Sequence, residues 1–175
     1  MAYSRAMPDV ERFAIHLQKE NFKFSAAHFL IFPDGSKERL HGHNYRVQVE
    51  IEAPLDRDGL VVDFKQVKPV IRGLCDELDE HWLVPGQHPE LEVEVGDDGH
   101  TRVAYRGDRY MAPSAEVIVL PIGNTSVENF ASWFAHEMKQ RLETRFGDVR
   151  FRRLRVAIEE TAGQHGVYEI ETMAG

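Results

Sequence analysis

The sequence predicts an α+β domain in which two helices cover one face of an antiparallel four-stranded sheet. Two kinds of periodicity support this prediction. Apolar and polar residues alternate over long stretches near both ends of the chain, and apolar residues recur every three or four positions over two stretches between them. The 175 residues are 42% hydrophobic and 29% charged, so we treat residues 1–175 as one ordinary globular domain.

The first strand is predicted at about 13–30 and the second at about 41–54. Residues in phase on the apolar face of the first are Phe22, Phe24, Ala26, His28 and Leu30. Its phase slips near Glu20 and Asn21, which indicates a β-bulge. Those on the apolar face of the second are Tyr45, Val47, Val49 and Ile51. The polar stretch PDGSKER, residues 33–39, is typical of a turn between them.

Two helices are predicted to follow these strands. Asp63 is the expected N-cap of the first helix, and Pro69 inside it is expected to cost a hydrogen bond or to bend the first turns. The apolar positions of this helix are Phe64, Val67, Ile71, Leu74 and Leu78. For the second helix, Thr125 and Glu128 form the expected capping box. Its apolar stripe consists of Val127, Phe130, Phe134, Met138 and Leu142.

Two more strands, at about 149–160 and 166–172, close the chain and are joined by TAGQHG. Between the helices, an inserted excursion at 84–122 contains three short strand-like runs, LEVEV, TRVAYR and EVIVL. The predicted order is therefore two strands, a helix, a small β insertion, a second helix and two strands.

Composition and charge exclude several functional classes. The net charge of −8 argues against a nucleic-acid surface. No stretch approaches the roughly 18 apolar residues that a membrane span needs, and the start, MAYSRAMPDVERF, lacks an apolar signal core. The single cysteine, Cys75, excludes an internal disulfide framework and indicates a reducing, cytoplasmic location. The one basic cluster, RFRRLR at 150–155, is interpreted as a solvated or interface face, with a local phosphate contact as the alternative.

Three histidines are expected to converge where the first two strands pair. Alternation places His41 and His43 on the apolar face at the start of the second strand, and His28 on the apolar face at the end of the first. In an antiparallel pair, the end of one strand lies beside the start of the other. Three imidazoles with an open fourth position are typical of a catalytic zinc site. The alternative is a set of separate core histidines, each of which donates to a backbone carbonyl.

A second group of ionisable residues lies where the first predicted helix ends. Asp79, Glu80 and His81 follow one another in ELDEHWLVP. They are interpreted either as an acid–base group or as charges that interact only with the helix terminus.

Six short motifs occur along the chain in the order FSAAH, LHGHNY, GLVVDF, LDEHWL, TSVEN and EET. In this order and context they resemble the 6-pyruvoyl-tetrahydropterin synthase / 6-carboxytetrahydropterin synthase family. The resemblance covers nearly the whole chain, except for the N-terminal dozen residues and the 84–122 excursion. Each motif alone is weak, but the combination is highly specific.

The resemblance implies a tunnelling fold, in which trimers close a twelve-stranded barrel and two trimers stack as a homo-hexamer. Closure of this kind is physically reasonable, because an isolated sheet exposes two edges. The resemblance also implies a zinc-dependent lyase that acts on 7,8-dihydroneopterin triphosphate. Its Zn²⁺ ligands match His28, His41 and His43.

Residues for the dihydropterin substrate are implied in the same way. The family's pterin-anchoring glutamate matches Glu160, and the motifs around it and before the second helix add Thr161 and Ser126 as candidate substrate-binding residues. Independently, Glu160 is in phase with the apolar residues Leu154, Val156 and Ile158. A carboxylate on an apolar face must find hydrogen-bond donors, which a pterin can supply.

The chain departs from the family pattern where members usually carry a cysteine, four residues before H-G-H. Lys37 occupies that position, and Glu38 follows it. When the family pattern is aligned without a gap, its Asp-His pair falls on Asp79 and Glu80. When the alignment is shifted by one residue, the histidine of the pair falls on His81. The candidate catalytic residues are therefore Lys37, Glu38, Asp79, Glu80 and His81. The alternative for the charged loop is a solvated turn.

Some members of this superfamily with a glutamate near the cysteine position are associated with cleavage of the dihydroneopterin side chain. We therefore expect aldolase-type carbon–carbon cleavage that yields a 6-substituted pterin. The alternatives are a conventional 6-carboxy- or 6-pyruvoyl-tetrahydropterin synthase, and a pseudoenzyme that binds pterin and metal without turnover. A structural protein with coincidental histidines is the remaining class.

Overall fold

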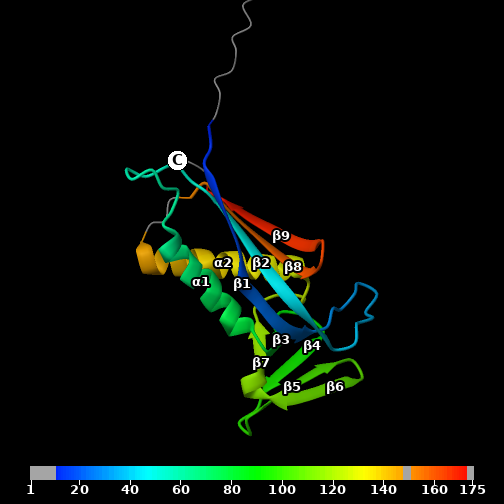
Figure 1. Cartoon of the computed structure of the whole chain (residues 1–175). Coiled ribbons are helices and arrows are strands. Elements are labelled where there is room, and N and C mark those ends of the chain that lie inside the picture. Colours follow the sequence, from blue (N-terminus) through cyan, green and yellow to red (C-terminus); the bar gives the residue numbers. More distant parts are fainter. Residues whose placement is uncertain (1–10, 148–150, 173–175) are drawn as a thin grey trace, which may run out of the picture.

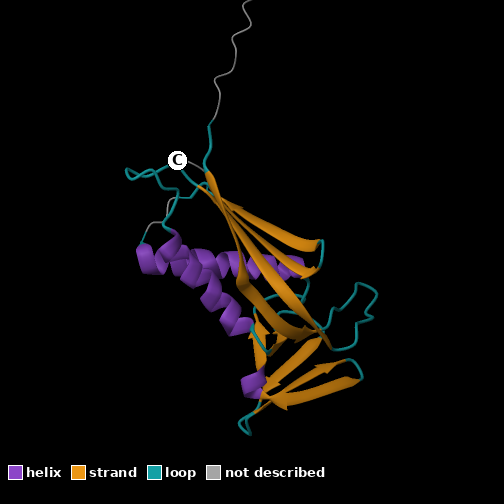
Figure 2. Cartoon of the chain, in the orientation of Figure 1, coloured by secondary structure: helices purple, strands orange, loops and turns teal. Residues whose placement is uncertain are grey.

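The computed structural model describes residues 11–147 and 151–172. A long twisted sheet carries two α-helices on one face, and a small second sheet lies near the end of β1 (Figures 1 and 2). This arrangement confirms the predicted α+β class. No helix within these two ranges combines the length and the apolar character that crossing a membrane requires.

The main sheet has six strands in the order β7-β3-β1-β2-β8-β9. Their bounds are β1 (Ala14–His28), β2 (His41–Glu52), β3 (His81–Pro85), β7 (Val117–Leu120), β8 (Arg153–Thr161) and β9 (Gln164–Glu171). The antiparallel strands β1, β2, β8 and β9 are those that the alternation predicted. The short strands β3 and β7 add to the edge of β1 in parallel, and the sequence pattern did not place them in this sheet. The first two residues of the strand expected at 149–160 lie outside the described residues.

The register of β1 and β2 determines where the site forms. His28 pairs with His41, and Ala26 pairs with His43, so the three imidazoles start from adjacent positions. The register shifts between Gln18 and Lys23. This shift confirms the bulge predicted there, and it keeps the apolar face of β1 turned toward the helices on both sides of the irregularity.

Helix α1 (Phe64–Leu78) begins at the predicted N-cap, because the Asp63 side chain accepts a hydrogen bond from the backbone N–H of Lys65. The helix continues through Pro69. It packs against β1 and α2, and its buried residues are Val67, Val70, Ile71, Leu74, Cys75 and Leu78.

Helix α2 (Val127–Phe146) packs against β8 and β9. The capping box predicted at Thr125 and Glu128 was wrong by one residue. Ser126 is the N-cap, and its hydroxyl accepts a hydrogen bond from the backbone N–H of Asn129. The Thr125 side chain is fully buried and its hydroxyl donates to the Phe29 carbonyl, 2.7 Å away, so it does not serve the helix.

The core between the helices and the sheet supports the histidine end of β1 and β2. Phe24 stacks on Tyr45 with ring centroids 4.8 Å apart, and Phe130 of α2 meets Tyr45 edge-on at 5.5 Å. All three side chains are almost completely buried. Aromatic pairs in these arrangements contribute about 0.5–1.5 kcal/mol beyond their buried area. His28 therefore lies beside a closely packed group of buried aromatic side chains.

The insertion between the helices forms its own three-stranded antiparallel sheet. Its strands are β4 (Leu91–Val95), β5 (His100–Tyr105) and β6 (Asp108–Pro113). A second apolar core joins this sheet to the main one through Phe29, Ile31, Trp82, Val84, Val103 and Tyr105. His28, the last residue of β1, contacts Phe130 of α2, whereas the next residue, Phe29, packs in the second core beside the insertion.

Candidate metal centre and active site

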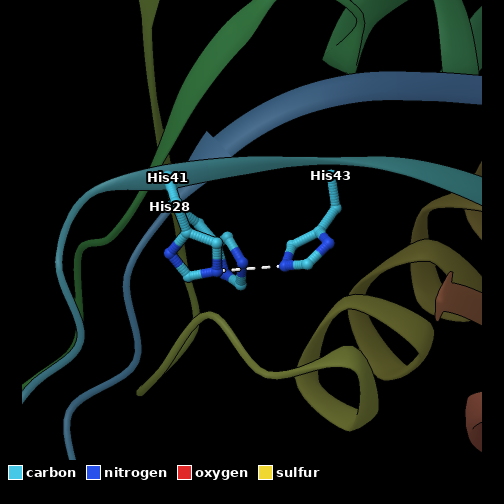
Figure 3. A group of neighbouring side chains, drawn as sticks. All are labelled: His28, His41 and His43. Atoms are coloured by element: carbon cyan, nitrogen blue, oxygen red, sulfur yellow. Dashed lines mark hydrogen bonds between the residues drawn. The ribbon is translucent and has the colours of Figure 1, made fainter.

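His28, His41 and His43 converge as the sequence predicted (Figure 3). Each offers one ring nitrogen, and these three atoms lie within 4.8 Å of one another. All three rings project from the paired strands toward the segment that leads into α2 (Figure 3). Antiparallel pairing and period-two alternation together place them on one face.

Backbone carbonyls fix the orientation of two of the rings. His28 Nδ1 lies 3.0 Å from the Thr125 carbonyl oxygen, and His41 Nδ1 lies 2.7 Å from that of Arg39. Each Nδ1–H donates to its carbonyl, which leaves Nε2 unprotonated and free to bind a metal ion. His41 Nε2 is 3.0 Å from His43 Nε2.

The His28 ring shows that these residues fit a metal ion. Its Nε2 is buried and has no hydrogen-bond partner among the described residues, an arrangement that costs about 1–3 kcal/mol. Burial lowers the pKa of His28 and so favours the neutral form that binds metal. Ligand nitrogens about 2.0–2.1 Å from a tetrahedral metal lie about 3.3 Å apart, close to the observed separation of His41 and His43. The alternative prediction was of separate core histidines that each donate to a backbone carbonyl. The rings of His28 and His41 do donate to carbonyls, but their Nε2 atoms converge with His43.

Glu160, on β8, lies beside the three histidines. Its Oε1 is 3.4 Å from His28 Nε2 and 3.8 Å from His43 Nε2. The Tyr45 hydroxyl donates to the same oxygen over 3.1 Å. Burial, followed by the charge of Glu160, raises the pKa of Tyr45, so this hydroxyl stays protonated and remains a donor.

Glu38 approaches the histidines from the loop between β1 and β2. Its Oε2 lies 3.9 Å from His41 Nε2 and accepts a hydrogen bond from the backbone N–H of Leu30 over 3.2 Å. The Lys37 ammonium instead contacts the insertion, 2.6 Å from the Tyr110 hydroxyl and 2.9 Å from Asp108. Of the two neighbours, the structure therefore places the Glu38 carboxylate next to the candidate metal ligands.

Asp79, Glu80 and His81 form a tight connection between α1 and β3. Asp79 is the C-cap of α1, and its carboxylate accepts the Ser25 N–H over 2.6 Å. The His81 Nδ1–H donates to the Asp79 carbonyl over 2.6 Å, and Glu80 has a positive φ of 59°. Glu80 and His81 line an open depression of about 470 Å³, which His43 also lines. Within the part of the chain that the structure describes, no hydrogen bond or ion pair joins these three residues to the histidine cluster.

Ser126 and Thr161, the other predicted substrate-binding residues, make local hydrogen bonds. Ser126 caps α2, and the Thr161 hydroxyl donates to the Gln164 side chain over 2.9 Å in the turn between β8 and β9. Their roles toward a substrate stay predictions.

Sequence reasoning missed two groups that shape the site. The carbonyl of Thr125 orients His28, and the hydroxyl of Tyr45 holds Glu160. A backbone carbonyl carries no side-chain signal. Tyr45, in contrast, is the one aromatic residue with a polar tip on the apolar face of the predicted second strand, and such a hydroxyl usually finds a partner when it is buried.

The fold and the site together define an α+β protein with a cluster of three histidines that could hold a metal ion, flanked by two carboxylates. The chain belongs to the 6-pyruvoyl tetrahydropterin synthase family, whose model matches residues 16–171. This match confirms the family that the sequence motifs resemble.

Individual relatives agree with this membership. A putative 6-carboxy-5,6,7,8-tetrahydropterin synthase of Methanocaldococcus jannaschii is 33% identical over 83% of this chain and 88% of its own length. The solved 6-pyruvoyl tetrahydropterin synthase of Plasmodium vivax superposes with a TM-score of 0.85 over 93% of this chain and all of its own, at 23% identity. Another solved form of the Plasmodium vivax enzyme, 22% identical with the same coverage and TM-score, is a mutant in which a glutamate described as a catalytic residue is changed to alanine. These two likenesses show a shared fold.

Proposed function

We propose that this protein is a zinc-dependent lyase of pterin biosynthesis that acts on the side chain of 7,8-dihydroneopterin or its triphosphate. The observation that carries the proposal is the convergence of three imidazole nitrogens beside the carboxylates of Glu38 and Glu160. Family membership and the 6-carboxytetrahydropterin synthase relatives support the choice of a pterin as substrate.

The Nε2 atoms of His28 and His41, with a ring nitrogen of His43, are proposed to hold the zinc ion and to leave one position open. Zinc bound there would polarise an oxygen of the substrate side chain. Glu160, held by Tyr45, is proposed to bind the ring of the pterin through its amino and N–H groups. The ring and its side chain would then lie between Glu160 and Glu38.

We favour aldolase-type cleavage, with Glu38 as the group that moves protons. The base removes the proton of a side-chain hydroxyl, and a carbonyl forms at that carbon. The bond to the carbon attached to the ring breaks, its electron pair stays on the ring-side carbon, and a proton is returned there. The products are a 6-substituted dihydropterin and an aldehyde, so the reaction needs no oxidant. A 6-pyruvoyltetrahydropterin synthase of Plasmodium vivax with the same fold has a glutamate described as a catalytic residue, which supports a catalytic role for a carboxylate in this chain.

Glu80 and His81 are proposed to exchange protons with solvent through the depression that His43 also lines. Asp79, whose carbonyl accepts from the His81 ring, is proposed to orient that ring. Lys37 is the other predicted proton carrier. Its contacts with Tyr110 and Asp108 favour a supporting task instead.

The relatives' names favour a second candidate, a conventional 6-carboxytetrahydropterin synthase. Lys37 at the position of the usual family cysteine argues against this candidate and against 6-pyruvoyl-tetrahydropterin formation. Incubation of the zinc-loaded protein with dihydroneopterin and with its triphosphate, followed by identification of the pterin products, tests the choice. A 6-carboxy or 6-pyruvoyl product would overturn aldolase-type cleavage.

Replacement of Glu160 by Gln is expected to weaken pterin binding roughly ten- to a hundredfold. Gln keeps the shape and still accepts the Tyr45 hydroxyl, but it removes the anion, and a hydrogen bond to a charged group contributes about 1.5–3 kcal/mol. Calorimetric titration with a non-reactive pterin measures the affinity. Zinc content is expected to be unchanged. A loss of zinc would instead make Glu160 a metal ligand. Unaltered pterin affinity would mean that another residue binds the pterin ring.

The protein is expected to be a hexamer of two stacked trimers, or at least a trimer. The main sheet ends in two open edges, β7 and β9, where Val119 and Val167 are 40% and 41% exposed. Unpaired edges favour pairing with further copies, and one chain has too few strands to close a barrel. Light scattering at micromolar concentration measures the assembly, and a stable monomer would contradict this expectation.

A further inference from the structure

The small sheet β4–β6 is attached to the loop at 33–39 by Lys37, whose side chain is largely covered. Lys37 Nζ donates to the Tyr110 hydroxyl and pairs with Asp108, both in β6. It also lies over the ring of Phe29, 5.2 Å from its centroid. The side chain is only 11% exposed, so this cation is enclosed by the insertion instead of being solvated.

The Lys37 side chain remains protonated in this environment. Burial opposes it, but the hydrogen bonds to Tyr110 and Asp108 outweigh burial and raise the pKa of Lys37. A permanently charged ammonium does not act as a base near neutral pH. It does act as a strong point of attachment, because charge-assisted hydrogen bonds are about twice as strong as neutral ones.

A second contact holds the same loop to the same sheet. The Tyr105 hydroxyl donates to the Gly35 carbonyl over 3.0 Å. The Arg106 guanidinium lies so close that a Cβ on Gly35 would come within 2.0 Å of it. Gly35 also has a φ of +80°, a backbone conformation that favours glycine. The loop therefore contacts the insertion at two positions, Gly35 and Lys37.

The attachment continues from Lys37 to the carboxylate at the site. Lys37 Nζ donates to the Glu38 carbonyl over 3.3 Å. The Glu38 N–H donates to the Leu30 carbonyl over 2.9 Å, and the Leu30 N–H donates back to Glu38 Oε2. These bonds hold the same carboxylate oxygen 3.9 Å from His41 Nε2.

We propose that the three-stranded insertion is a positioning element for Glu38, in which Tyr110 and Asp108 hold Lys37 and thereby keep the Glu38 carboxylate beside His41. Lys37, Tyr110 and Asp108 are then positioning residues. The proposal rests on the proposed function of Glu38, and it assigns a task to a segment that the family motifs do not cover.

The test is Tyr110→Phe, which removes the hydroxyl and keeps the ring, in the full-length zinc-loaded protein. Displacement of a catalytic group by about 1 Å can cost a hundredfold in rate. We expect kcat for dihydroneopterin cleavage to fall about 10- to 100-fold, with KM and zinc content unchanged. Hydrogen exchange at the amides of Leu30 and Glu38 is expected to accelerate, which reports on position without turnover. Arg102→Gln is the matched control, since Arg102 pairs with Asp98 inside the insertion, and it should change none of these quantities.

A double-mutant comparison separates this proposal from the proposed function. If Lys37 acts only through Glu38, Lys37→Met should lower kcat in the native background and cause no further loss in the Glu38→Gln background. Additive losses would overturn the proposal. The proposal would also be overturned if Glu38→Gln lowers kcat but Tyr110→Phe changes neither kcat nor hydrogen exchange. In that case the proposed function of Glu38 would still stand. If Glu38→Gln is fully active, the proposed role of Glu38 fails, and the exchange rates alone decide whether the insertion holds the loop.

Discussion

Glu38→Gln is expected to lower kcat by about 10²–10⁴-fold, the usual cost of removing one positioned acid–base group. The amide is almost isosteric and can still accept the Leu30 N–H, so the loop should keep its conformation. It cannot take up a proton from a substrate hydroxyl. Pterin affinity and zinc content should therefore survive while turnover is lost, and steady-state kinetics with dihydroneopterin measures the difference.

Asp34→Asn is a matched control for this substitution. Asp34 lies in the same loop, and its carboxylate accepts from the Ser36 N–H and hydroxyl. Asparagine supports such a turn equally well, so the control removes one negative charge and leaves the site unaltered. Full activity in both Glu38→Gln and Lys37→Met would reduce the charged loop to a solvated turn. Absence of product from the native protein with either substrate would favour the pseudoenzyme.

The centre of the site could be predicted because it depends on two local rules. Alternation assigns a face to every residue of β1 and β2, and antiparallel pairing brings the end of one strand to the start of the next. His28, His41 and His43 follow from these rules without any long-range information. Glu160 follows similarly, since its phase in β8 turns it inward to Tyr45.

What the sequence did not reveal depends on contacts between distant segments. The parallel strands β3 and β7 are short and mostly apolar, and short runs of this kind do not show which sheet they join. The cap of α2 moved from Thr125 to Ser126 because the Thr125 hydroxyl bonds to Phe29, 96 residues away. Lys37 in a polar loop looked either solvated or catalytic, because its partner Tyr110 lies 73 residues further along the chain.

The largest expected effect on the metal centre is that of His41→Ala. Removal of groups that merely orient a metal ligand costs about 10–100-fold in affinity, so loss of a ligand itself should weaken zinc binding by more than about 100-fold. His41 is the best choice of the three histidines for this test. Its side chain is 37% exposed, whereas that of His28 is 1% exposed, so truncation at position 41 leaves little cavity in the core.

Zinc content after dialysis against a buffered low zinc concentration measures the loss directly, and thermal unfolding gives an independent reading. A ligand that binds only the folded state at 100 times its Kd stabilises it by about 2.7 kcal/mol, which for a domain of this size raises Tm by roughly 5–10 °C. The native protein should show this increase on addition of zinc, and His41→Ala should show almost none. His136→Ala, which removes an exposed imidazole on α2, should behave like the native protein. If His41→Ala keeps its zinc and its full thermal response, the three histidines are core residues whose nitrogens converge without binding a metal ion.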